Sequence, residues 1–254
     1  MPSPMSQKNS PSRQSGRRRA RLGLALAAGL LAAFLVSRHL RAPRRMPHVA
    51  LWRRVLVEKR GEGEADRLLA RAQRRYEELY AERPRLANRA LRFHLERSIL
   101  PGLALYRALL EENDDREAAL SEMESVMAPS LAELRWLLPL LDRLPDPFGA
   151  FRRIVPLVVR FGFPPEGWGI EAVEDSEDCH AYNIHRCIYL DTLTSYGASE
   201  LTPVYCGGDD TVFAALPPSI TWERTMTMGR GDDHCDFRWC RGTPEGTTPA
   251  VGQR

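Results

Sequence analysis

Apolar side chains recur every three or four residues along the first half of the chain, which is the spacing of amphipathic helices. These helical patterns begin near Glu64, Leu86, Arg116, Leu131 and Phe148. Proline removes a backbone donor and restricts the residue before it, and prolines end or interrupt the patterns at Pro84, Pro101, Pro145, Pro147 and Pro156. Asp114 is expected to cap the helix that begins at Arg116. The first half therefore predicts a helical subdomain over residues 61–163.

After Pro165 the pattern changes to short alternating runs, which are typical of β-strands. Strands are predicted over residues 168–173, 180–185, 220–228 and 235–240, the last two forming a hairpin. Short helices are predicted between them, one closed by Gly197 and one beginning with Ser199 as its cap. The predicted fold class is α+β: a helical amino-terminal half, then a small antiparallel sheet with two short helices over residues 164–241.

A single membrane helix is predicted ahead of this body. Residues 22–36 read LGLALAAGLLAAFLV, without a charge or a proline. As a helix they span roughly 22 Å, short of the ~30 Å hydrocarbon core, so the predicted anchor extends to residue 40. Two other interpretations are a cleaved signal peptide, for which Ser37–Arg41 is a poor cleavage site, and a buried globular helix, which the basic leader disfavours. An uncleaved single-pass anchor over residues 22–40 is the favoured interpretation.

The remaining segments are polar and unevenly charged. Residues 1–21 predict a disordered basic leader, residues 41–60 a basic tether and residues 242–254 a flexible tail. The net charge is only +3, and arginines before residue 60 supply most of the excess. This distribution favours contact with membrane phosphates over nucleic acid, for which the sequence holds no binding motif.

The chain has five cysteines, all in its final third: Cys179, Cys187, Cys206, Cys235 and Cys240. The odd number and the spacing match no standard disulfide framework, so free thiols in a reducing compartment are expected, with the body on the cytoplasmic side. No CxxC pair occurs, and neither a metal site nor a cofactor is predicted. His180 and His185 would fall on opposite faces of a strand and are expected to be partly exposed.

The first candidate for chemistry is Cys206 with Asp209 and Asp210. Their spacing of three and four residues lets at least one carboxylate share the helix face of the thiol. A thiol beside a carboxylate fits a nucleophile or a pocket wall next to a general base. The alternative is a core cysteine on a helix whose aspartates face solvent.

The closing hairpin supplies the other candidates, Arg224, Cys235 and Asp236. Arg224 would alternate with Trp222 and Met226 on one strand face, and its planar guanidinium suits a substrate carboxylate. Its alternative is a weak ion pair with Asp236 across the hairpin. Cys235 and Asp236 are adjacent on a strand and point to opposite faces, so they cannot both face one pocket. Cys235 is the catalytic candidate and Asp236 a substrate-binding one; alternatively, Asp236 holds the turn at residues 229–233.

Several segments of the second half, taken in order, resemble a known family. They are Cys187 at a strand-to-helix junction, Gly197–Leu201, Tyr205–Asp210, Glu223–Thr227 and Cys235–Phe237, preceded by the helical stretch Ile99–Tyr106. Residues 86–240 thereby resemble the L-2-amino-thiazoline-4-carboxylic acid hydrolase family. The resemblance implies hydrolytic opening of a thiazoline ring to N-carbamoyl-L-cysteine, and it leaves the predicted anchor uncovered.

The sequence therefore predicts a membrane-anchored hydrolase of a small substrate, one that opens a thiazoline ring or cleaves a related C–N bond. Such chemistry needs an activated water, a proton donor for the ring nitrogen or leaving sulfur, and a group that holds the substrate carboxylate. The alternative is a non-catalytic small-molecule-binding or sensory domain on the same fold, similar to domains related to vinyl-reductase accessory proteins. The same cysteines would then line a pocket without reacting.

Overall fold

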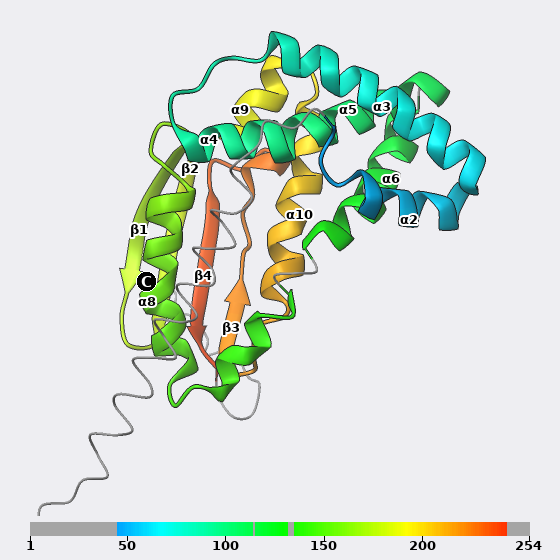
Figure 1. Ribbon diagram of the computed structural model, residues 1–254. Helices are drawn as coiled ribbons and strands as arrows, with labels where there is room; N and C mark the ends of the chain where they lie inside the picture. The colour runs from blue at the N-terminus through cyan, green and yellow to red at the C-terminus, as the bar shows by residue number, and fades with distance from the viewer. Residues whose placement is uncertain (1–44, 114, 132–134, 243–254) are drawn as a thin grey trace, which may run out of the picture. The chain divides into compact units, whose positions relative to one another are not determined.

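The first half of the body is helical, as the periodicity predicts. The computed structural model describes residues 45–113, 115–131 and 135–242, which belong to one compact unit (Figure 1). Its helices in this half are α2 (Val49–Arg60), α3 (Glu62–Glu82), α4 (Arg89–His94), α5 (Leu100–Asn113), α6 (Arg116–Met127) and α8 (Pro147–Gly162). Short 3₁₀ turns lie at Ala128–Leu131 and Leu138–Arg143. The apolar stripe of α3 is buried as expected, which fixes this helix against the core.

Helix α2 occupies part of the segment that the sequence analysis expects to be a tether. Trp52 and Leu56, one turn apart, are fully buried, and the Trp52 indole N–H donates to Ser130 Oγ at 3.1 Å. The helix was missed because its two buried positions stand among arginines and give only a weak apolar pattern. Basic composition alone therefore did not distinguish a packed helix from a linker.

Three expectations about helix caps and lengths are wrong. The cap of α6 is Asp115 rather than Asp114, because Asp115 Oδ1 accepts the Ala118 N–H at 3.0 Å. Where a helix was expected over residues 131–144, the described part contains the 3₁₀ turn Leu138–Arg143. In the second half, Ser199 begins a 3₁₀ turn and makes no capping hydrogen bond, and the following helix starts at Thr202.

The expected interruption at Pro101 is instead a continuous helical segment with a π-helical turn at Leu95–Ile99 between α4 and α5. Proline has no N–H to offer the preceding turn, which leaves backbone carbonyls there in need of donors. Side chains supply them: Tyr76 donates to Glu96 O at 3.0 Å, and Tyr205 to Ser98 O at 3.0 Å. The turn thus stays helical because side chains distant in the sequence donate hydrogen bonds to its backbone carbonyls.

The second half forms the predicted α+β layer, with a four-stranded antiparallel sheet in the order β1-β2-β4-β3. The strands are β1 (Trp168–Asp175), β2 (Cys179–Cys187), β3 (Ile220–Glu223) and β4 (Cys235–Arg241), and the helices are α9 (Ile188–Ser195) and α10 (Thr202–Phe213). Figure 1 shows α8 lying along β1 and β2 and α10 running beside β3. Phe151 of α8 and Phe213 of α10 both contact Trp239 of β4, with ring centroids 5.7 and 5.1 Å apart, so both helices cover the same sheet face.

Strand β3 is shorter than expected, and this moves Arg224 out of the sheet. The strand ends at Glu223, so Arg224 does not alternate with Trp222 and Met226 on one strand face. The Asp236 carboxylate accepts the N–H groups of Thr225 and Met226, so a side chain takes up these backbone donors in place of a strand partner.

His180 is buried rather than partly exposed: it is 2% accessible and lies opposite Trp239 in the register. His180 and His185 do lie on opposite faces of β2, as the alternation predicts. The sequence pattern does not show that helices cover the face on which His180 lies. His185 is exposed and pairs with Glu171.

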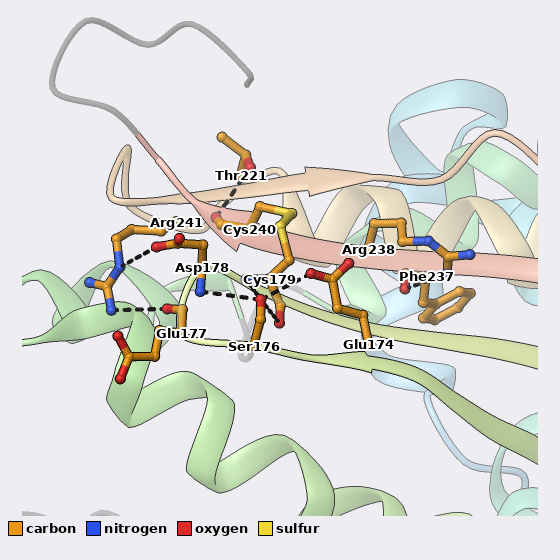
Figure 2. The surroundings of a disulfide bond; sticks show 10 residues. All are labelled: Glu174, Ser176, Glu177, Asp178, Cys179, Thr221, Phe237, Arg238, Cys240 and Arg241. Atoms are coloured by element: carbon orange, nitrogen blue, oxygen red, sulfur yellow. Dashed lines mark hydrogen bonds and ion pairs between the residues drawn. A yellow bond between two sulfur atoms is a disulfide. The ribbon is translucent and has the colours of Figure 1, made fainter. Parts of the chain in front are cut away.

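A disulfide joins Cys179 and Cys240, which face each other across β2 and β4 (Figure 2). The expectation of five free thiols is therefore wrong for this pair, and the argument for a reducing compartment loses its basis. Sequence spacing could not reveal the bridge, because its two residues lie 61 positions apart and meet only through strand register. Cys187, Cys206 and Cys235 are free.

Among the described residues, no helix combines the length and apolar character needed to cross a membrane. The predicted anchor at residues 22–40 lies outside those residues and stays a prediction of the sequence.

Candidate active site

One face of α10 carries the polar residues expected to do chemistry. Cys206, Asp209, Asp210 and Phe213 follow at spacings of three, four and seven residues, so they share the side of the helix that faces the sheet. The helix begins with Pro203 in its first turn, a position where proline's missing N–H costs nothing. Helical periodicity thus places a thiol, two carboxylates and an aromatic ring along one line.

Arg224 enters this line from the loop after β3. Its side chain is only 3% exposed. It donates to Asp210 Oδ2 at 2.5 Å, to the Cys206 carbonyl at 3.0 Å and to Asp209 Oδ2 at 3.3 Å. These three hydrogen-bond acceptors belong to α10, so the geometry favours a positioning role over the expected capture of a substrate carboxylate.

The two aspartates are held differently. Both oxygens of Asp210 are occupied, Oδ1 by the Trp222 indole N–H at 3.2 Å and Oδ2 by Arg224. Asp209 receives only the longer bond from Arg224, and its Oδ1 has no hydrogen-bond partner within the described part of the chain. Asp209 is therefore the carboxylate with a free oxygen.

The environment of Asp209 suits acid–base chemistry near neutral pH. Desolvation raises the pKa of its carboxyl to about 7, Arg224 opposes the rise and Asp210 adds to it. The side chain nevertheless keeps 45% of its surface accessible. Solvent and a small molecule can therefore reach this carboxyl, although the neighbouring protein raises its pKa.

The three free thiols lie near this carboxylate and are held in their neutral form. Burial raises the pKa of Cys206 to about 12, with Asp209 as the next contribution. Burial also raises the pKa of Cys187 to about 11, and it raises that of Cys235 although the Met228 N–H, which donates to Cys235 Sγ at 3.3 Å, opposes it. A side chain at Gly229 would place its Cβ 2.9 Å from Cys206 Sγ, so glycine lets the loop approach the thiol.

Asp236 holds the loop after β3. Its carboxylate accepts the Thr225 N–H at 2.9 Å, the Thr225 hydroxyl at 2.7 Å and the Met226 N–H at 2.5 Å. Burial alone would raise its pKa, but these hydrogen bonds outweigh burial and lower it. The turn that Asp236 was expected to hold is tied instead by Asp232, which accepts the Thr227 N–H at 2.6 Å. Cys235 and Asp236 lie on opposite faces, as alternation requires.

Aromatic residues around the site were not singled out from the sequence. Trp222 bonds Asp210, Phe237 lies under the Arg224 guanidinium at 5.6 Å, and the Tyr189 hydroxyl pairs with His94 Nδ1 at 2.8 Å. Phe213 had a usable signal, its seven-residue spacing from Cys206; the others meet the site only through tertiary packing. Among the described residues, no group of three or more histidine, cysteine or acidic side chains could hold a metal ion.

The fold defines an α+β protein in which helix α10, with its thiol and two carboxylates, lies beside a four-stranded antiparallel sheet. The sequence matches the L-2-amino-thiazoline-4-carboxylic acid hydrolase family over residues 92–239, more than half of the chain, and the protein belongs to this family. This confirms the resemblance seen in the sequence. No curated protein has a sequence that matches the chain.

Two similar solved structures are H-NOX proteins. An H-NOX protein from S. oneidensis in the Fe(II)NO ligation state has a TM-score of 0.38 and 12% identity, covering 78% of this chain and 100% of that one. An Fe(II) unliganded H-NOX protein from K. algicida has a TM-score of 0.36 and 12% identity, covering 81% of this chain and 97% of that one. Likeness at this level carries no argument about function.

Proposed function

We propose that the protein is a hydrolase that opens the ring of a thiazoline or cleaves a related C–N bond of a small substrate. The observation that carries the proposal is the asymmetric aspartate pair: Arg224 and Trp222 occupy Asp210, while Asp209 keeps a free oxygen beside the Cys206 thiol. Family membership supports the reaction class.

In this mechanism Asp209 moves protons in two stages. Its carboxylate first takes a proton from water as the water oxygen attacks the ring carbon between sulfur and nitrogen, and this proton passes to the ring nitrogen. It then takes the proton of the new hydroxyl as the C–S bond breaks and the carbonyl forms, and this proton passes to the departing sulfur. One water is consumed and one thiol is released, so atoms and charges balance.

The other polar residues position Asp209 or face the reacting atoms. Arg224, fixed by Asp210 and the Cys206 carbonyl, keeps the Asp209 carboxylate oriented. Cys206 is protonated at neutral pH because burial raises its pKa, so we assign it as a hydrogen-bond donor and pocket wall rather than a resting thiolate.

Turnover of 2-amino-thiazoline-4-carboxylate, followed by detection of the released thiol, tests the proposal on the full chain. We expect Asp209→Asn to lower kcat by about 10²-fold or more, the usual contribution of a positioned acid–base group. Since the base must be deprotonated, kcat/KM of the parent should fall as pH drops below about 7, the pKa of Asp209.

Asp233→Asn is the matched control, because Asp233 is exposed on the turn before β4, and it should leave kcat unchanged. Full turnover by Asp209→Asn, with melting temperatures alike, would refute the role of Asp209. Binding of the thiazoline by the parent without any thiol release would instead identify the non-catalytic binding domain.

A further inference from the structure

Beside the acid site, the inner sheet face carries aromatic rings that the fold does not fully cover. Trp239 and Tyr182 on this face are buried at 3% and 7% accessibility, under α8. Trp222, Phe237 and Phe213 stay only partly buried, although they stand on the same side of the sheet. Solvent therefore reaches part of each of these three residues, which we call the aromatic wall.

The rings of this wall are ordered against one another. The centroid of Phe213 lies 4.4 Å from that of Trp222, and Phe237 packs edge-on to Trp222 at 5.0 Å. Such tilted and T-shaped contacts fix ring orientation and leave faces or edges that suit another flat apolar group.

The aromatic wall is continuous with the acid site. The Trp222 indole N–H donates to Asp210, and the Arg224 guanidinium lies over Phe237. Phe213 stands one helical turn beyond Asp209 and Asp210 on the same face of α10. A molecule with its reacting carbon at Asp209 therefore has apolar rings within reach on one side.

We propose, on the basis of the function proposed above, that the aromatic wall binds the non-reacting part of the substrate and that this part is a flat aromatic group. The substrate class is then a thiazoline carboxylate with an aryl substituent on the ring carbon that water attacks. Water addition and C–S cleavage convert it to an N-aroyl cysteine, with the same proton transfers and no additional reactant.

Binding to the full-length Asp209→Asn chain tests this inference without requiring catalysis. The probes are 2-phenyl-2-thiazoline-4-carboxylate and 2-amino-2-thiazoline-4-carboxylate, measured by calorimetry. We expect the phenyl probe to bind about 10-fold more tightly, since an aromatic contact of about 1.4 kcal/mol corresponds to that factor. Adding Phe213→Leu should remove most of this preference and change affinity for the amino probe by less than about 2-fold.

Phe161→Leu makes the same substitution at a ring that is 69% exposed on α8, and it should leave both affinities unchanged. Equal affinities of the two probes, no binding of either, or a phenyl preference that survives Phe213→Leu would overturn the inference. If Asp209→Asn prefers the phenyl probe but the parent turns over neither probe, the aromatic binding site stands and the proposed hydrolysis is refuted. Failure of the binding inference and failure of the proposed function are therefore distinguishable.

Discussion

Arg224 shows how the partners of a single residue decide its role. The sequence predicts a guanidinium that is free to bind a ligand, but Arg224 is 3% exposed and bonded to Asp209, Asp210 and a backbone carbonyl. A guanidinium with these partners stabilises the arrangement around it, and the unpaired oxygen of Asp209 becomes the reactive feature instead.

The carboxyl of Asp209, with its pKa of about 7, also makes the free energy of unfolding depend on pH. The folded chain holds that proton more tightly than the unfolded one, so the stability contribution falls as pH rises towards 7.

Gly102 is a second residue whose identity is set by a distant neighbour. A Cβ at Gly102 would lie 1.9 Å from the Tyr205 hydroxyl, which donates to Ser98 O and Ile99 O. We expect Gly102→Ala to destabilise the protein by about 2 kcal/mol, because it forces Tyr205 away and leaves buried carbonyls without a donor. Urea unfolding measures the change.

Gly63→Ala is the matched control for that substitution. Gly63 lies in α3 with only the flexible end of Arg67 nearby, so alanine there should stabilise the helix by up to about 1 kcal/mol. Adding Tyr205→Phe to Gly102→Ala should recover part of the loss, since it removes the clashing oxygen. A Gly102→Ala protein as stable as the parent would show that α5 and α10 can move apart without loss of stability.

At the scale of elements, the loop between β3 and β4 is shaped by a carboxylate. Asp236 ties the backbone at Thr225 and Met226, which ends β3 early and turns Arg224 towards α10. The strand pattern extends to Met228 in the sequence, but side-chain bonding to the backbone competes with the ladder there. The hairpin is therefore shorter than the alternation predicts.

We expect Asp236→Ala to cost about 3 kcal/mol at pH 7, because buried N–H groups lose their acceptor. The folded pKa of Asp236 is lowered, so its contribution is present above the unfolded pKa of about 4 and is lost as pH falls through the lower folded value. Unfolding free energies of the parent and the variant, measured from pH 7 downwards, should converge in acid. If the difference in unfolding free energy between parent and variant is the same at every pH, the lost stability comes from packing alone.

At the scale of the whole molecule, the site is assembled from parts far apart in the chain. Helix α10 supplies Cys206 and Asp209, the loop after β3 supplies Arg224, and Cys187 and Cys235 come from the ends of β2 and β4. Helix α4 and the π-helical turn after it reach the same region, because His94 bonds to Tyr189 and the Ser98 carbonyl accepts from Tyr205. The sheet order, which places β4 between β2 and β3, brings these segments together.

The Cys179–Cys240 disulfide closes the chain around these segments, and this yields a further prediction. Its closed loop of about 60 residues implies stabilisation of about 4 kcal/mol by loop-closure entropy. We expect that amount to be lost in the Cys179→Ala/Cys240→Ala double variant, measured by chemical denaturation.

Alkylation in denaturant checks the bridge itself. Mass spectrometry should show three labelled cysteines without reductant and five with it, in keeping with the three free thiols of the structure. Cys187→Ala, which removes one free thiol, should give two and four. Five labels without reductant would show that the bridge does not form.

The sequence by itself determined the fold class, the order of most helices and strands, and the family. Periodicities of 3.6 and 2 report which positions need burial, and proline and glycine mark where regular backbone must end. The line of Cys206, Asp209 and Asp210 was also predictable, because helical spacing is local. Tertiary structure alone decided the disulfide, the burial of His180, the packing of α2 and the capture of Arg224 by Asp210. Each depends on which surface another segment covers, and that information lies in contacts between residues far apart in the chain.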